Sequence, residues 1–415
     1  MNPENYKHIS PNLYQHILSS NHERLKVEAR KFGHVSLESW YFTSSEAHAF
    51  DLREIIRKSW QFACHVSMLP VPSSFVTMNF AGLEIIVLRN HQGKHKAFAN
   101  TCPHRGARLV KEGSGLLSRS MLCPVHGWSF GLDGELSNIP RWKEDFPHVA
   151  KNDCKLREYP VDLFEGMLFV QLGGEAPPPS ITLDGFKEII SLYRIPDMML
   201  SYLPETSEFQ ANWKLIMEND RNADHIPCIH PEYNDLFGYR GFTEVLYPHG
   251  VWHAALPMKQ RTPKLWTSRN YQKLLPKFDG IPDVLSDVWM NFNVFPNFSF
   301  FIHPEAVDIM QIIPSGPDSS IIRSVGLKMD VTSREIEAAR YLAGRLDEMV
   351  FGQEQVMLEG LQSVLNQGNF SAGPVSATEY GVLDYNRCLF ETYEKAGVRA
   401  PGHRLSVQPL EIAHG

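Results

Sequence analysis

The sequence lacks the features that mark several large classes of protein. It has no low-complexity tract, and its longest apolar runs, such as residues 83–88 and 167–172, are only long enough for a strand, so no membrane-spanning helix is expected. The formal net charge is −7, without the basic stripe of a nucleic-acid binder. Residues 1–20 are polar and contain no signal-peptide core. We therefore expect a cytoplasmic protein that binds neither nucleic acid nor membrane.

Cysteine is scarce, with six in 415 residues, and four of the six follow no framework spacing. These four are Cys64, Cys154, Cys228 and Cys388. A secreted disulfide scaffold is therefore not expected. The four thiols are interpreted as small buried side chains in a reducing compartment.

A complete nucleotide-binding loop is also absent. Gly113-Ser114-Gly115 begins like the dinucleotide fingerprint, but Ser118 stands where the third glycine belongs, and no βαβ pattern surrounds it. No flavin or nicotinamide site and no plant-type ferredoxin cysteine set is recognisable either. Electrons for a redox reaction must therefore come from another protein.

The remaining two cysteines occur with histidines in two short motifs. Cys102-x-His104 is separated by eighteen residues from Cys123-x-x-His126. Two thiolates and two imidazoles can ligate a two-iron cluster, in which histidine replaces cysteine on one iron, or a structural zinc ion. A glycine follows each histidine within two residues, where backbone N–H groups can approach the sulfurs. These flanks favour the cluster over zinc.

Residues 41–175 have the pattern of an antiparallel β domain, and residues 1–40 form an N-terminal segment. Short strands are predicted at 75–78, 83–89 and 96–100, with turns at 90–93 and 133–134. The stretch 173–179 contains two glycines and three consecutive prolines, which break both helices and strands. We place the domain boundary there.

Residues 176–415 are predicted to form a mixed α+β domain. Helical patterns occur at 183–193 and 212–221, and strand patterns at 251–256, 290–302, 307–313 and 321–329. Thr332-x-x-Glu335 has the form of a capping box and predicts helices that run to about Asn366.

His225 and His230 form the next candidate site. On an ideal helix two residues five positions apart point roughly 140° away from each other, so an unbroken helix would not chelate a metal with them. Pro227 and Pro231 end or kink the helix and allow the second imidazole to turn back toward the first. By itself, however, this spacing favours two unrelated polar histidines.

Several runs of the chain resemble the large (alpha) subunit of the Rieske-type non-haem iron oxygenases, which hydroxylate aromatic rings or demethylate betaines. The runs 102–106 and 123–128 closely resemble the Rieske iron-sulfur motif. Asn212-Trp213-Lys214, followed by Glu218-Asn219 and His225, resembles the family's iron-binding segment in order and spacing. Segments 59–61 and 64–66 extend the resemblance to nearly the whole chain.

The resemblance implies an α+β fold with two parts. An N-terminal Rieske antiparallel β domain would bind one [2Fe-2S] cluster through Cys102, His104, Cys123 and His126. A mixed α+β catalytic domain would follow, with an antiparallel sheet flanked by helices in a START-like helix grip, and would hold one mononuclear Fe(II).

The resemblance also implies a carboxylate ligand on a late helix, eight residues before a glutamine. Counting back from Gln362 gives Glu354, which together with His225 and His230 would complete a facial triad with open iron positions. Glu354 shares a helical stripe with Leu358, Leu361 and Leu365, where a buried unpaired carboxylate would be costly. The alternative is a glutamate at the helix edge with its carboxylate in solvent. The family more often has aspartate here, and Asp347 is the reserve candidate, although its spacing is wrong.

A second departure from the family concerns the residue three positions before the first iron histidine. The family usually has an acid there, which hydrogen-bonds that histidine and a Rieske histidine of the neighbouring subunit. This chain has Asn222, and Asp224, which is adjacent to His225, could partly replace the acid. Electron transfer from His126 through Asn222 or Asp224 to His225 is therefore a hypothesis.

The function implied by the resemblance is that of a terminal oxygenase component, a monooxygenase or dioxygenase that activates O2 when substrate is present. The product would be hydroxylated, or demethylated through a hydroxymethyl intermediate. Electrons would come from a separate NAD(P)H-dependent reductase or ferredoxin, and Lys111, Arg119 and Lys143 are candidates for its docking site. A homotrimer, or an oligomer built from trimers, would bring one subunit's cluster beside the next subunit's iron.

Two alternatives from other classes stay open at this point. The chain could be an electron carrier or redox sensor whose second iron site is degenerate, or a zinc-stapled structural or ligand-binding protein.

The substrate is also open, between an aromatic compound and an N-methylated or quaternary ammonium compound. An aromatic cage would suit a quaternary ammonium, and an apolar slot ending in Arg or Lys would suit an aromatic acid. Candidate pocket residues, each of which fits a plain core equally well or better, are Tyr202, Trp252, Met258, Trp289, Phe292, Val294, Phe295 and Phe301.

Overall fold

The computed structural model describes residues 23–401 except 33–35, 112, 239–242, 332 and 377, and the chain is divided into two compact units. One unit comprises residues 56–181, and the other joins the described residues up to 55 to those from 182 onward. The domains predicted at 41–175 and 176–415 differ from these units at both boundaries. Residues 41–55 belong with the C-terminal part because their side chains, such as Tyr41 and Phe50, are buried against its helix 380–395.

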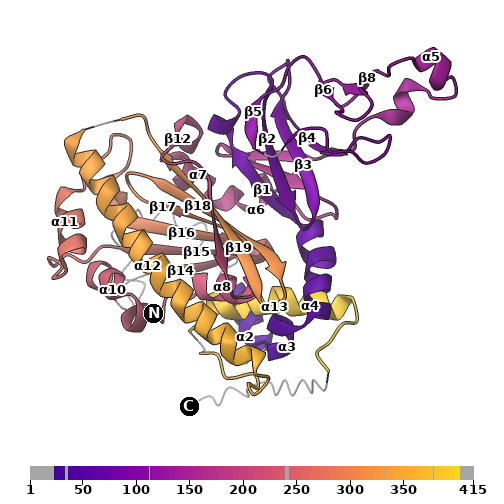
Figure 1. Ribbon diagram of the computed structural model, residues 1–415. Helices are drawn as coiled ribbons and strands as arrows, with labels where there is room; N and C mark the ends of the chain where they lie inside the picture. The colour runs from indigo at the N-terminus through magenta and orange to yellow at the C-terminus, as the bar shows by residue number, and fades with distance from the viewer. Residues whose placement is uncertain are drawn as a thin grey trace. The chain divides into compact units, whose positions relative to one another are not determined.

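The unit 56–181 is built from antiparallel strands in three small sheets, ordered β1-β11-β10, β5-β2-β3-β4-β9 and β6-β7-β8 (Figure 1). Its elements are β1 (Trp60–His65), β2 (Ser74–Phe80), β3 (Leu83–Arg89), β4 (His95–Ala99), β5 (Ser114–Leu116), β6 (Met121–Leu122), β7 (Ser129–Phe130), β8 (Leu136–Asn138), α5 (Trp142–Asp145), β9 (Glu158–Tyr159), β10 (Val161–Phe164) and β11 (Met167–Gln171). The strand predicted at 83–89 coincides with β3, and the other two overlap β2 and β4. The predicted linker 173–179 follows β11 within this unit.

The second unit contains an eight-stranded antiparallel sheet in the order β12-β19-β18-β17-β16-β15-β14, with β13 also paired to β19. Its strands are β12 (Met199–Leu200), β13 (Glu205–Phe209), β14 (Thr243–Tyr247), β15 (Val251–Pro257), β16 (Val288–Val294), β17 (Phe298–Ile302), β18 (Val307–Gly316) and β19 (Ser319–Lys328). Its helices are α2 (Glu23–Phe32), α3 (Ser39–Thr43), α4 (Ser45–Phe50), α7 (Lys187–Ser191), α8 (Trp213–Asp220), α9 (Ile226–Ile229), α10 (Pro231–Leu236), α11 (Trp266–Leu274), α12 (Arg334–Asn366) and α13 (Tyr380–Lys395). The short helix α6 (Pro179–Thr182) ends the unit 56–181, and only its last residue belongs to the second unit. An antiparallel sheet flanked by helices was predicted.

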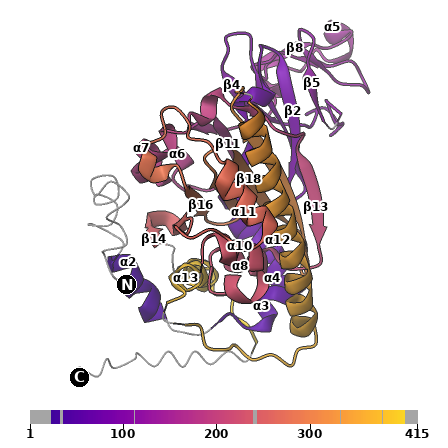
Figure 2. The same cartoon turned by 90° about the vertical axis from the view of Figure 1, so that its left-hand side faces the viewer.

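The long helix α12 runs past the sheet (Figures 1 and 2). Its buried side chains Ala339, Leu342 and Leu346 pack in one cluster with Tyr271 of α11 and Trp289 of β16. Each fully buried leucine of this kind contributes about 2 kcal/mol of hydrophobic stabilisation. The apolar stripe therefore fixes which side chains of α12 face the sheet.

Three predictions for this unit need correction. The strand predicted at 290–302 is two strands, β16 and β17, because Pro296 lies between them and has no backbone N–H for a ladder. The helix predicted at 183–193 is only the short α7 with flanking turns. Thr332 of the predicted capping box lies outside the described residues, and the Ser333 hydroxyl instead accepts from the Ile336 N–H at 3.2 Å to begin α12.

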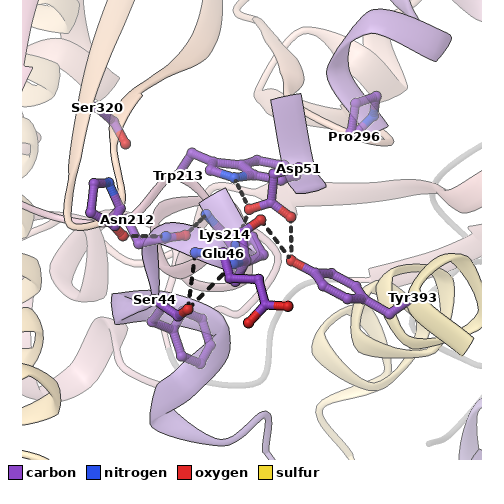
Figure 3. A network of polar contacts seen from close by, with 12 residues as sticks. Ser44, Glu46, Asp51, Asn212, Trp213, Lys214, Pro296, Ser320 and Tyr393 are labelled. Carbon is purple, nitrogen blue, oxygen red and sulfur yellow. Dashed lines mark hydrogen bonds and ion pairs between the residues drawn. The ribbon is translucent and has the colours of Figure 1, made fainter. Parts of the chain in front are cut away.

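Helix α8 is held at its start by a buried polar network (Figure 3). The Asn212 side chain caps the helix by accepting from the Lys214 N–H at 2.9 Å. Lys214 forms an ion pair with Asp51, and both side chains have no exposed surface. The same carboxylate accepts from the Trp213 indole N–H at 2.9 Å and from the Tyr393 hydroxyl. The network joins α8 to α13 and to the segment before residue 56, and so positions the histidines that follow α8.

In the described part of the chain, no helix combines the length and the apolar character needed to cross a bilayer.

Candidate metal centres

The two cysteine-histidine motifs lie on two loops of the unit 56–181 that have the same backbone hydrogen bonds. In the first loop the Gly106 N–H donates to the Cys102 carbonyl at 2.9 Å, and in the second the Gly127 N–H donates to the Cys123 carbonyl at 3.1 Å. Both glycines have positive φ, at 76° and 71°. Only glycine adopts this conformation without strain, so the two glycines allow each loop to close tightly around its cysteine.

The sulfurs of these loops are buried and receive backbone hydrogen bonds. Cys102 and Cys123 are each 1% exposed, and the amides of His104 and Arg105 hydrogen-bond the Cys102 sulfur. Burial raises the pKa of the Cys102 thiol to about 11, and the adjacent Cys123 thiol adds to this, whereas the two amides lower it. Two buried thiols cannot both ionise alone, but a metal deprotonates a coordinating thiol. The pair therefore fits a metal cluster.

The histidines of the same loops lie nearer the surface. The rings of His104 and His126 are 4.7 Å apart between centroids, and His104 stacks on Trp128 at 4.7 Å. His104 Nδ1 has no hydrogen-bond partner, and His126 is exposed. Among the described residues, two groups have three or more ligand atoms within 4.8 Å of one another, and neither comes from these loops. Two thiols and two imidazoles are the ligand set of a two-iron centre in which histidine replaces cysteine on one iron.

The loop geometry leads to a prediction about the two glycines. A Cβ at Gly127 would lie 3.1 Å from Pro140 Cγ, whereas one at Gly106 would meet nothing within 4 Å. In both variants the alanine must adopt a left-handed backbone conformation, which costs about 1–2 kcal/mol. Only in Gly127→Ala does the new methyl group also press against Pro140 and displace the Cys123 loop. We expect Gly127→Ala to lower the cluster content per chain, measured by visible absorbance, clearly more than Gly106→Ala. Equal losses would mean that the contact with Pro140 is irrelevant.

His225 and His230 lie where the helical path after α8 is broken. His225 is the residue before α9 and His230 separates α9 from α10, with φ −117° and ψ 78°. Pro227 and Pro231 occupy the first turns of these two short helices. The break brings the two imidazoles together, with 3.1 Å between their Nε2 atoms.

Glu354 of α12 faces both imidazoles. Its Oε1 lies 3.5 Å from His230 Nε2 and 3.8 Å from His225 Nε2. Two ligands at right angles on an ion with bonds of about 2.1 Å are about 3.0 Å apart, close to the separation of the two Nε2 atoms. Burial raises the pKa of Glu354, but hydrogen bonds and charge from the two histidines outweigh it and lower this pKa to about 2. The three donors therefore fit one divalent ion, with Glu354 ionised.

Neighbouring side chains orient these donors. His230 Nδ1 lies 2.8 Å from Gln353 Oε1, whose amide nitrogen is turned to Glu232 at 3.4 Å. An amide oxygen only accepts, so the proton of His230 is on Nδ1 and the Nε2 lone pair is free for a metal. The Asn219 side chain donates to Glu354 Oε1 at 3.1 Å. His225 Nδ1 is buried and has no partner.

Two expectations about the helix α12 differ from the structure. Asp347, the reserve ligand, accepts from the Tyr233 hydroxyl at 2.6 Å and groups with His303 and Asp308, not with His225. Leu361 is 47% exposed, so it is wrong to include it in a buried stripe with Leu358. At this end of α12 the buried side chains are Leu358, Gln362 and Leu365, and Leu361 lies to one side of the face that they form.

Asn222 is hydrogen-bonded to Asp224 and also to Glu379, a residue that the sequence did not indicate. The Asn222 amide donates to Glu379 Oε1 at 2.7 Å, and its oxygen accepts from the Asp224 N–H at 2.7 Å. Glu379 precedes α13 and its other oxygen accepts from the Ser376 N–H at 2.6 Å. A carboxylate is therefore present beside position 222 although it comes from 157 residues further along the chain.

A cavity of about 520 Å³ lies between the sheet and α12 and reaches His225, His230 and Glu354. Of the eight candidate pocket residues, those in its wall are Tyr202, Trp252, Trp289 and Phe301. Those absent from the wall are Met258, Phe292, Val294 and Phe295, which fit the core interpretation. Six carboxylates also line it, from Glu205, Asp220, Asp308, Asp347, Glu348 and Glu354. Within the described residues, its wall contains no lysine or arginine.

Two sequence profiles match the chain. The profile of the Rieske [2Fe-2S] domain matches residues 59–160, and that of the ring hydroxylating alpha subunit (catalytic domain) matches residues 196–395. Among solved structures, the quaternary ammonium Rieske monooxygenase CntA in complex with L-carnitine superposes with a TM-score of 0.73 at 19% identity, over 88% of this chain and 97% of that chain. The predicted α+β fold with a Rieske β domain is confirmed.

Curated relatives are oxygenase subunits. The chain is 25% identical over 390 residues to the glycine betaine monooxygenase oxygenase subunit of Chromohalobacter salexigens, which covers 85% of this chain and 84% of that protein. It is 31% identical over 199 residues to the carnitine monooxygenase oxygenase subunit of Acinetobacter baumannii, covering 47% of this chain and 52% of that protein. The large oxygenase component of a naphthalene 1,2-dioxygenase system from Ralstonia sp is 33% identical over 182 residues, covering 42% of this chain and 40% of that protein. The last two matches span about half the length of those relatives.

Proposed function

We propose a terminal oxygenase function for this chain, which belongs to the Rieske-type non-haem iron oxygenases as a large (alpha) subunit. The observation that carries the proposal is the presence of two different donor sets on one chain. Cys102, His104, Cys123 and His126 would hold the [2Fe-2S] cluster, and His225, His230 and Glu354 would hold the mononuclear iron. When bound, these groups supply one-electron transfer and dioxygen activation.

The residues around the second donor set prepare it for this chemistry. Three donors on one side of an ion leave positions open toward the cavity, where substrate and O2 can enter. Gln353 holds His230 in the tautomer that presents Nε2, and Asn219 holds the Glu354 carboxylate. This convergence favours an oxygenase over an electron carrier with a degenerate second site, which was the alternative.

The partners of the chain are part of the proposal. A separate NAD(P)H-dependent reductase or ferredoxin would dock near the Rieske loops around His104, with Lys111, Arg119 and Lys143 as exposed cations on the same unit. The apolar side chains of Leu122 and Val125 are each 60% exposed and would be covered by a partner.

Exposure of His126 in the single chain also supports a homotrimer, in which a neighbouring subunit reaches it. The four cysteines outside the cluster motifs form no disulfide, which supports a cytoplasmic location.

Glu379 is proposed to supply the charge that the family usually places at position 222. Its carboxylate is hydrogen-bonded to Asn222, three residues before His225. We expect Glu379→Gln and Asn222→Ala to slow electron delivery to the mononuclear iron by about tenfold or more while both metals stay bound. Stopped-flow reoxidation of the reduced cluster, with metal analysis as the control, measures this. An unchanged rate in both variants would remove both residues from the electron path.

The substrate class follows from the charge of the cavity wall. An aromatic acid, or another carboxylate, requires a cation that the described wall does not contain. A small nitrogen compound that is positively charged is complementary to the five carboxylates that remain when Glu354 is assigned to the iron. We therefore propose hydroxylation or oxidative demethylation of an N-alkylated substrate.

Oxygen uptake tests the proposed function. The holoenzyme is supplied with a generic reductase and NADH, and O2 consumption is followed with a panel of methylammonium compounds and aromatic acids. Substrate-dependent uptake with the positively charged compounds is expected. Uptake only with aromatic acids would contradict the substrate class, and no stimulation by any compound in a protein containing both metals would contradict the oxygenase.

A further inference from the structure

A second group of chemically active side chains lines the cavity away from the proposed iron ligands. His303 follows β17, Asp308 lies on β18 and Asp347 lies on α12. One ligand atom of each lies within 4.8 Å of the others, and His303 Nδ1 is 3.8 Å from Asp308 Oδ2. All three residues are part of the cavity wall.

This group has hydrogen-bonding capacity that the protein does not use. His303 is only 2% exposed, and its Nδ1, which faces Asp308, has no hydrogen-bond partner. Asp308 accepts from the Tyr202 hydroxyl at 3.3 Å and Asp347 from the Tyr233 hydroxyl at 2.6 Å. A carboxylate has about four acceptor sites, so one hydroxyl leaves most of them open.

The charge of the group is also unbalanced. Burial raises the pKa of Asp308 to about 6 and that of Asp347 well above its ordinary value, and burial lowers the pKa of His303 to about 3. The imidazole therefore adds no positive charge at neutral pH. Arg340, the cation beside the neighbouring Glu305, is held by Glu337 and by backbone carbonyls. Two carboxylates in a cavity wall without a cation require a bound positive charge or a proton.

We propose that Asp308, Asp347 and His303 form a subsite for an ammonium group that carries at least one N–H, on a substrate without a carboxylate. The inference rests on the proposed function and names the part of the same cavity that selects the substrate.

The spacing of the group fits a small cation. His303 Nδ1 lies 3.8 Å from Asp308 Oδ2, the same distance as between His225 Nε2 and Glu354 Oε1. This distance suits either an ammonium or a metal ion, so the hydrogen-bonding surroundings and the metal-uptake experiment below distinguish the two cations.

The surroundings favour an N–H ammonium over a quaternary one. A quaternary nitrogen offers no donor and is recognised on the faces of aromatic rings. Here one face of Trp289 is covered by the His303 ring at 3.7 Å, and Tyr233 and Tyr271 pack against Trp289 edge to face. Unused oxygen and nitrogen acceptors surround the subsite instead, and these call for N–H donors.

The position of the subsite also limits the length of the substrate. Asp347 and Glu354 are seven residues apart on α12, and seven residues of helix rise about 10 Å. A substrate whose nitrogen is held at Asp347 therefore reaches the proposed iron ligands with a chain of a few bonds. The carbon that is oxidised would lie at the end remote from this ammonium, so of the two proposed reactions a substrate held in this way would undergo hydroxylation and not demethylation of the bound nitrogen.

Calorimetric titration of the metal-loaded protein, without reductase, tests the subsite independently of turnover. The probes are pentylammonium, pentyltrimethylammonium, 1-pentanol and pentanoate, which differ only in the head group. We expect the Kd of pentylammonium to be at least ten-fold lower than that of each of the other three. Asp308→Asn and Asp347→Asn should each raise it at least ten-fold, while Asp330→Asn, at an exposed position just after β19, should not change it.

Several results would overturn the inference. If pentyltrimethylammonium bound as tightly as pentylammonium or more tightly, the cavity would be a site for a quaternary nitrogen. If 1-pentanol bound as tightly as pentylammonium, the positive charge of the head group would not contribute to binding. Uptake of Mn²⁺ or Zn²⁺ beyond the irons in the wild type, lost in Asp347→Asn, would make the group a metal site. The wild-type probe series decides the matter even if a variant does not fold. Iron content and O2 uptake are measured separately, so a failure of the oxygenase function is distinguishable from a failure of the subsite.

Discussion

Glu354→Ala is expected to lose the mononuclear iron while retaining the two-iron cluster. The variant removes one of three donors and the only anionic one, leaving two imidazoles 3.1 Å apart. The iron content should fall from about three to about two per chain. Substrate-dependent O2 uptake should fall on the order of 10³-fold or more, as for other residues that act as a unit in catalysis.

Asp347→Asn is the matched control for this prediction. Asp347 lies on the same helix and was the reserve candidate, but its carboxylate accepts from Tyr233 and does not approach His225. The control should therefore keep about three irons per chain. Metal analysis and the visible spectrum of both variants check this. If Glu354→Ala kept the mononuclear iron and Asp347→Asn lost it, Asp347 and not Glu354 would be the carboxylate ligand.

Asp51→Ala is expected to have the largest effect on stability. Asp51 and Lys214 form an ion pair without exposed surface, and Asp51 also accepts from Trp213 and Tyr393 (Figure 3). Removing one partner leaves a buried ammonium uncompensated, which costs about 3–5 kcal/mol. The free energy of unfolding should fall by this amount, and iron binding at His225 should weaken because α8 is no longer held.

Denaturant unfolding of the metal-loaded protein measures this effect. Asp283→Ala is the control, since the pair between Lys277 and Asp283 is largely exposed. That variant should change the free energy of unfolding by less than about 0.5 kcal/mol. A loss of similar size in both variants would show that burial of the Asp51 pair carries no special weight.

The parts of the fold and site that were predictable depend on residues near one another in the sequence. The cluster loops combine cysteine, histidine and a positive-φ glycine within six residues, and Pro227 and Pro231 explain why His225 and His230 can converge. Strand β3 is apolar except for Glu84 and Arg89, and its bounds were predicted correctly. Glu354 was found only through the family resemblance, because a glutamate on a helix carries no local signal of its own.

The parts that were missed depend on contacts between distant residues. Glu379 reaches Asn222 across 157 positions, and His303, Asp308 and Asp347 meet only when the sheet and α12 are assembled. The segment 41–55 was assigned to the wrong part because its burial against α13 has no trace in composition. By contrast, the break in the strand predicted at 290–302 could have been predicted from the sequence. Pro296 is a local signal, because proline has no backbone N–H for the hydrogen-bond ladder of a sheet.

Metal analysis of the purified chain, combined with its visible spectrum, tests whether one chain holds both metal centres. We expect a reddish protein with about three irons per chain, two in the cluster and one mononuclear. A colourless protein that contains zinc in place of iron would contradict it.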